Sequence, residues 1–163
     1  MTYAIEVNNL NKVYDGFELK DVCFKLETGT IMGIVGENGA GKSTIIKGIL
    51  DLINIDSGDI KIFGKDFKEN ASEIKKDISV VFDESYFHDN LKLPDIDKIM
   101  KNIYPNWDKN KFLKYTNHFK LPNNKRIKDF SRGMKMKLSI AVALSHNTKL
   151  LILDEATSGL DPV

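Results

Sequence analysis

Hydrophobic and polar residues alternate near the start of the chain, a period of two that predicts β-strands with one buried face. The alternating apolar residues are Ile5 and Val7, followed by Val22, Phe24 and Leu26. Cys23 falls in the second of these runs, where its residue type favours a small buried side chain. It is the one cysteine of the chain and forms no internal disulfide, which is typical of a reducing compartment.

Further along, short apolar runs alternate with segments of helical period. Residues 30–35 and 150–153 are almost wholly apolar, a pattern typical of strands that are buried on both faces. Strands are also predicted near residues 60–63 and 78–82, and helices near residues 45–53, 71–76, 96–103, 112–119 and 131–145, the last of them capped by Ser131. Strands that alternate with helices predict an α/β fold around a mainly parallel sheet, with the later helices as an insertion.

The composition narrows the class of protein. The chain has 163 residues, of which 42% are hydrophobic and 29% charged, enough for one compact domain with a sizeable core. This composition excludes disordered, collagen-like and disulfide-rich classes. The N-terminus lacks the features of a signal peptide, and no apolar run reaches the roughly 18 residues of a membrane span. We therefore expect a soluble, cytosolic protein.

The net charge of +1 hides an uneven distribution. Residues 98–137 contain twelve Lys or Arg and two acids, a net charge of +10, which leaves −9 for the remainder. A basic segment of this size favours an anionic neighbour, such as a membrane surface or an acidic partner, or else it is a lysine-rich solvated helix surface. Only Arg126 and Arg132 are arginines, which disfavours specific recognition of nucleic acid.

A glycine-rich loop follows the apolar run at residues 30–35. Residues 36–43 match the pattern G-x4-G-K-[ST], and the order strand, loop and helix is the one that a phosphate-binding loop requires. Backbone amides of such a loop approach a polyphosphate closely, the lysine reaches the β- and γ-phosphates, and the Ser43 hydroxyl is a Mg²⁺ ligand. The predicted nucleotide-binding residues are Gly36, Glu37, Asn38, Gly39, Ala40, Gly41, Lys42, Ser43 and Thr44.

The apolar run at residues 150–153 ends in two acids, Asp154 and Glu155. In proteins with a phosphate-binding loop, the first carboxylate at such a strand end holds Mg²⁺. A carboxylate one residue further is placed to polarise the attacking water, so Glu155 is the predicted catalytic residue.

Two motifs resemble those of ATP-binding cassette (ABC) ATPases. Residues 130–135, Phe-Ser-Arg-Gly-Met-Lys, resemble the signature motif, and residues 154–162 resemble the Walker B motif with its D-loop. The resemblance implies a P-loop NTPase (RecA-like) core with an N-terminal antiparallel β part and an inserted α-helical subdomain. Within a single domain over residues 1–163, the implied ATP-binding core comprises residues 1–83 and 138–163, and the helical subdomain residues 84–137.

The resemblance also assigns roles to single residues. Tyr14 lies where the family has an aromatic side chain that stacks on adenine. Ser131 and Gly133 are expected to contact the ATP of a second cassette in a head-to-tail dimer. Asp83 stands where the family usually has glutamine, which suggests a Mg²⁺ ligand. Arg132 replaces the first glycine of the signature, and either touches phosphate or the partner protein or is solvated.

The chain ends at Val163, directly after the D-loop. Family members continue with a strand that carries a catalytic histidine, so the resemblance implies that the C-terminal part of the cassette is missing. The three histidines, His88, His118 and His146, all precede the D-loop and are expected to be surface or packing residues.

The function that the resemblance implies is ATP binding and hydrolysis, with Mg²⁺, in a subunit that drives export through a separate membrane permease. Its expected partners are a second cassette, in a homo- or heterodimer, and the permease, which would place it at the cytoplasmic face of the membrane. Two alternatives stay open: a soluble ABC protein that acts on nucleic acid or ribosomes, and a nucleotide-binding fragment without turnover. A GTPase is disfavoured because Asn11-Lys12-Val13 is followed by Tyr14, which breaks the N-K-x-D motif.

Overall fold

The computed structural model describes residues 2–83 and 87–154. These residues form two compact units, which divide between Lys75 and Lys76. None of the helices within the described ranges is long and apolar enough to cross a lipid bilayer.

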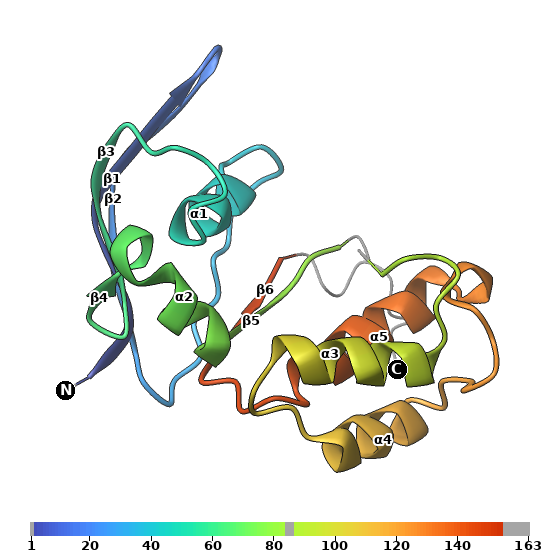
Figure 1. Cartoon of the computed structure of the whole chain (residues 1–163). Helices are drawn as coiled ribbons and strands as arrows, with labels where there is room; N and C mark the ends of the chain where they lie inside the picture. Colours follow the sequence, from blue (N-terminus) through green and yellow to red (C-terminus); the bar gives the residue numbers. More distant parts are fainter. Residues whose placement is uncertain (1, 84–86, 155–163) are drawn as a thin grey trace. The chain divides into compact units, whose positions relative to one another are not determined.

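The first unit is built on an antiparallel sheet with the strand order β2-β1-β3-β4 (Figure 1). Its strands are β1 (Tyr3–Tyr14), β2 (Phe17–Glu27), β3 (Ser57–Ile62) and β4 (Lys65–Asp66). Helix α1 (Lys42–Ile49) buries Ile45, Ile46 and Ile49, and α2 (Phe67–Asp77) follows β4. The predicted antiparallel β part at the N-terminus is therefore confirmed.

The strand predicted over residues 30–35 is absent. These residues form no ladder with any strand in the described part of the chain, and Ile31 and Val35 are 100% and 94% exposed. A strand that is buried on both faces is held by hydrogen-bonded neighbours and by helices that cover it. The strand prediction was therefore wrong. The apolar pattern indicates a preference for extended backbone, but residues 30–35 pair with no strand among the described residues.

Cys23 is also placed differently from the expectation, because its side chain is exposed. Val22 and Phe24 on either side are half-buried, and alternate residues of a strand point to opposite faces. Cys23 therefore lies on the open face of β2, where its Sγ accepts a hydrogen bond from the Asn9 N–H at 3.1 Å.

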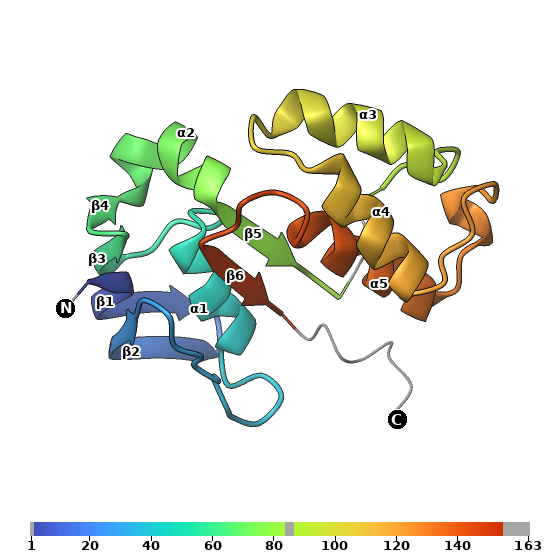
Figure 2. The same cartoon turned by 90° about the horizontal axis from the view of Figure 1, so that it is seen from below.

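In the residues that the structure describes, the second unit contains a pair of parallel strands and the helices α3, α4 and α5 (Figure 2). Its elements are β5 (Ile78–Val81), α3 (Leu93–Ile103), α4 (Lys109–His118), a 3₁₀ turn (Ile127–Asp129), α5 (Arg132–Ala143) and β6 (Leu150–Leu153). Ser131 caps α5 as predicted, because its hydroxyl accepts a hydrogen bond from the Met134 N–H.

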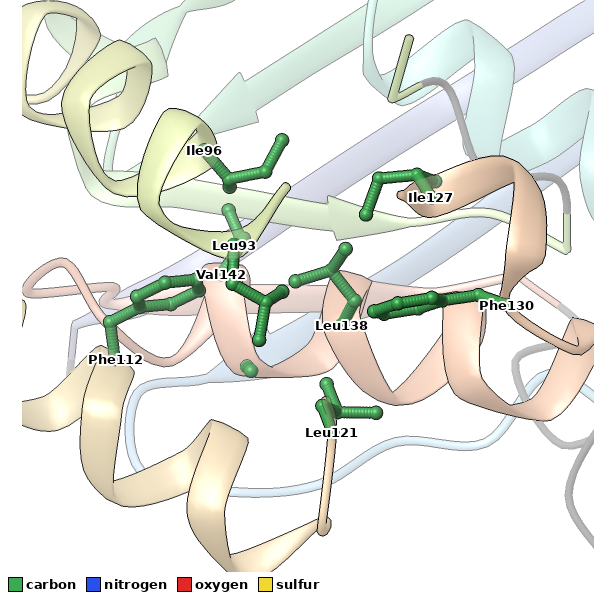
Figure 3. Packing of buried hydrophobic residues seen from close by; sticks show 9 residues of the cluster. Leu93, Ile96, Phe112, Leu121, Ile127, Phe130, Leu138 and Val142 are labelled. Carbon is green, nitrogen blue, oxygen red and sulfur yellow. The ribbon is translucent and has the colours of Figure 1, made fainter. Parts of the chain in front are cut away.

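The helices of this unit enclose a hydrophobic core, shown in Figure 3. Phe112 of α4, Ile96 of α3 and Leu138 of α5 are all at most 1% exposed. Leu93, Leu121, Ile127, Phe130 and Val142 complete the cluster that the figure labels. The helical periods in the sequence thus placed Ile96, Phe112 and Leu138 correctly in the core, whereas Ile99 and Ile103 of the same predicted stripe are exposed.

His146 is a packing residue, as expected, and it is 2% exposed. Its Nε2 lies 2.6 Å from the hydroxyl oxygen of Ser79, and its ring stacks on Tyr104 at 3.8 Å between ring centroids. Its Nδ1 is buried and has no hydrogen-bond partner among the described residues. Burial lowers the pKa of the imidazole, and the Asp77 carboxylate opposes this only in part, because a second proton would place an unpaired charge in the core.

Acid should therefore destabilise this unit through His146. The unfolded imidazole has a pKa of about 6.5. The stabilising contribution is complete above that pH and is lost as the pH falls below it, because the unfolded state then binds the proton more readily. We expect the urea midpoint to fall between pH 7.5 and pH 5.5, and the fall to be smaller in His146→Gln. The exposed His118→Gln is the matched control, and an equal pH dependence in all three proteins would contradict this account.

Candidate nucleotide-binding site

The glycine-rich loop adopts a conformation that depends on its glycines. Gly39 and Gly41 have φ angles of +85° and +89°, in the left-handed region that other residues rarely adopt. A Cβ atom at Gly41 would lie 2.6 Å from side-chain atoms of both Phe17 and Leu19, so the loop packs directly on β2. Any larger residue at Gly41 would strain the backbone and push the loop off this strand.

Lys42 is the first residue of α1 and folds back over the loop. Its Nζ donates hydrogen bonds to the carbonyl oxygens of Gly36 at 2.9 Å and Glu37 at 2.8 Å. The residue before α1, Gly41, provides no side-chain cap, and the first turn of the helix contains no acidic residue. The positive end of the helix dipole and the ammonium group therefore act at the same place, and both favour an anion.

Phe17 connects Tyr14 to this loop. Its ring stacks on Phe17 with 6.5 Å between ring centroids, and the tip of Phe17 reaches Gly41. Tyr14 is 43% exposed, and the Lys12 ammonium lies 5.2 Å from its ring centroid. It borders an open pocket of about 410 Å³ lined by Lys12, Tyr14, Asp51, Leu52, Ile53 and Asn54. An exposed ring face beside a phosphate-binding loop is a suitable platform for a planar base.

The other predicted site residues belong to the second unit. The backbone N–H of Asp154 donates to the Val81 carbonyl at 2.9 Å, which continues the ladder between β5 and β6 by one residue. Ser131 and Gly133 lie at the start of α5, where the first turn carries no acidic residue. Glu155 lies outside the described residues, and its predicted role stays a prediction.

Asp83 and Arg132 form an ion pair. Asp83 follows β5, Arg132 begins α5, and one guanidinium nitrogen lies 2.5 Å and 2.6 Å from the two carboxylate oxygens. The sequence had suggested a metal ligand at the first position and a contact with phosphate, a protein partner or water at the second. Neither prediction anticipated that the two side chains contact each other.

A family comparison decides what kind of chain this is. Residues 19–158 match the sequence model of the family described as ABC transporter. The chain belongs to the ABC transporter family. An ATP-binding subunit of an ABC transporter of known structure is 28% identical to it, with a TM-score of 0.85 over 98% of this chain and 69% of the other. The α/β P-loop NTPase fold expected from the motifs is thereby confirmed.

Two curated ABC proteins illustrate its relatives. The bacitracin transport ATP-binding protein BcrA of Bacillus licheniformis is 37% identical over the whole of this chain. The methionine import ATP-binding protein MetN of Clostridium acetobutylicum is 37% identical over 97% of it. The chain spans about half the length of these relatives, 54% and 52% respectively.

Phe17 is the residue of this ABC chain that the sequence reasoning missed. It connects the Tyr14 ring to the phosphate-binding loop, and the available signal was an aromatic residue directly after the turn glycine Gly16. The contact depends on the pairing of Tyr14 with Phe17 across the β1–β2 hairpin, which the alternation of apolar residues does not specify.

Proposed function

We propose that this chain binds ATP and is the nucleotide-binding part of an ABC transporter ATPase. The observation that carries the proposal is the phosphate-binding loop, with Gly39 and Gly41 in left-handed conformations and Lys42 at the start of α1. In this proposal the loop residues 36–44 bind the phosphates, and Tyr14 stacks on the adenine.

We assign the hydrolytic roles to residues of the sequence motifs. Ser43 and Asp154 offer a hydroxyl and a carboxylate, and oxygen donors of this kind fit Mg²⁺, which would neutralise charge on the phosphates when bound. We assign the activation of the attacking water to Glu155 on its position in the sequence. Replacing Glu155 with glutamine should therefore abolish turnover while nucleotide binding persists.

Family membership supports a proposal about the wider assembly. We propose that Ser131 and Gly133 contact the ATP of a second cassette, because the start of α5 is a helix N-terminus without acidic residues. We also propose that the dimer drives a separate membrane permease in the direction of export. The signature variant at residues 130–135 supports export, whereas MetN bears the word import in its name, so direction is the part that transport assays must decide.

Replacement of Tyr14 tests the nucleotide assignment. We expect Tyr14→Ala to weaken ATP and GTP binding by similar factors, because stacking depends on the face of the base and not on its exocyclic groups. One stacking contact contributes about 1–3 kcal/mol, or about 5- to 150-fold in affinity. Titration calorimetry with both nucleotides measures this effect.

The matched control is Tyr3→Ala, because Tyr3 lies at the opposite end of the same strand. It should leave both affinities unchanged. If the parent chain binds neither nucleotide, the proposed function is wrong. If Tyr14→Ala affects ATP alone, the side chain reads the edges of the base and the stacking account fails.

A further inference from the structure

The Asp83–Arg132 pair connects two segments that are 49 residues apart in the sequence. Asp83 lies two residues beyond Val81, the last residue of β5, and Arg132 is the first residue of α5. This contact connects the start of α5, which we call the signature helix because it begins within residues 130–135, to the residues that follow β5.

Other contacts hold the start of α5 in different ways. Phe130 anchors it in the core at 5% exposure, and Ser131 caps its first turn. Lys135 reaches the carboxylate of Asp89 at 3.6 Å, which is longer than the distances between Arg132 and Asp83. The Arg132 pair reaches Asp83, two residues beyond the end of β5, whereas Lys135 reaches Asp89 further along the same connection.

The Asp83–Arg132 pair is better suited to orient the start of α5 than to stabilise the fold of the second unit. The Arg132 and Asp83 side chains are 60% and 35% exposed, and ion pairs this accessible shift an equilibrium by no more than about fivefold. One guanidinium nitrogen nevertheless contacts both carboxylate oxygens, and a charge-assisted contact of this kind orients the two side chains more strongly than a neutral hydrogen bond does. Such a contact sets where a helix begins without governing whether the unit folds.

We propose that Asp83 and Arg132 act together as a positioning pair for the signature helix. Asp83 stands in place of the glutamine and Arg132 in place of the first glycine of the family pattern, and the two replacements have opposite charges. On this proposal Asp83 influences the site through Arg132 and the start of α5, and not as a Mg²⁺ ligand. The influence of this pair on the ATP site rests on the proposed function, whereas the coupling between the two residues does not.

Amide hydrogen exchange tests the coupling without nucleotide. The reporters are the Met134 and Lys135 amides, which donate to the hydroxyl and the carbonyl oxygen of Ser131. We expect Asp83→Asn and Arg132→Gln each to speed their exchange about two- to fivefold. The double variant should exchange no faster than either single one, and the charge swap Asp83→Arg with Arg132→Asp should restore slow exchange. Effects that multiply in the double variant would overturn the proposal.

The neighbouring pair supplies the matched control. In a Lys135→Gln background, which breaks the contact with Asp89, Asp83→Asn should still produce the same fold-change. If the effect of Asp83→Asn disappears there, a general loosening of the first turn explains the data and the specific pairing is wrong.

A second measurement separates positioning from metal binding. The Mg²⁺ concentration for half-maximal ATP binding should be the same in the parent chain and in Asp83→Asn. A shift that occurs in both the Arg132 and Arg132→Gln backgrounds would make Asp83 a metal ligand and overturn the proposal. If the parent chain binds no nucleotide, the proposed function fails while the exchange result still decides the coupling.

Discussion

Replacing Lys42 with alanine is expected to weaken Mg-ATP binding by about 10- to 150-fold. The change removes the side-chain cation that now donates to the carbonyl oxygens of Gly36 and Glu37. In a nucleotide complex the same ammonium would donate to phosphate oxygens, and a hydrogen bond to a charged group contributes about 1.5–3 kcal/mol. Titration calorimetry at constant salt measures the difference.

Lys47→Ala is the control for net charge, because Lys47 is an exposed residue in the last turn of the same helix. Its affinity should match that of the parent chain. Equal affinity in the Lys42 variant would remove the assignment of this loop to phosphate. An equal loss in both variants would point to long-range electrostatics instead.

Replacing Phe112 with alanine should reduce the free energy of unfolding of the second unit by about 3–5 kcal/mol. Phe112 is 1% exposed and contacts the core that α3, α4 and α5 share (Figure 3). The lost ring leaves a cavity that the surrounding helices fill only in part. Urea unfolding followed by the fluorescence of Trp107, whose ring centroid lies 5.2 Å from that of Phe112, reports on this unit.

The adjacent residue supplies the comparison. Leu113 is 38% exposed, so Leu113→Ala should cost far less than Phe112→Ala. Similar losses for the two variants would show that the core does not close around Phe112 as the structure indicates.

Local signals in the sequence were sufficient for much of this fold. Ser131 was recognisable as a helix cap because its hydroxyl bonds within one turn, and the phosphate-binding loop because its glycines, lysine and serine lie within eight residues. The periodic apolar residues predicted the buried face of α5, where Leu138 and Val142 lie in the core, but in α4 they placed both Phe112 and the exposed Leu113 in one apolar stripe.

The features that were missed depend on distant pairing. Whether residues 30–35 join a ladder depends on which strands are available as neighbours, and their composition alone does not contain that information. The ion pair between Asp83 and Arg132 joins residues that are 49 positions apart, and each side chain considered alone had another plausible role. Such contacts are set by tertiary packing and not by local propensity.

The open position of Cys23 on β2 has a practical consequence. The chain contains one cysteine, in the first unit, and one tryptophan, Trp107, in the second. A thiol-reactive acceptor dye on Cys23 would form an energy-transfer pair with the indole without any engineered residue. The efficiency of this energy transfer would report the distance between Trp107 and Cys23 as ATP is added, with no change to the sequence.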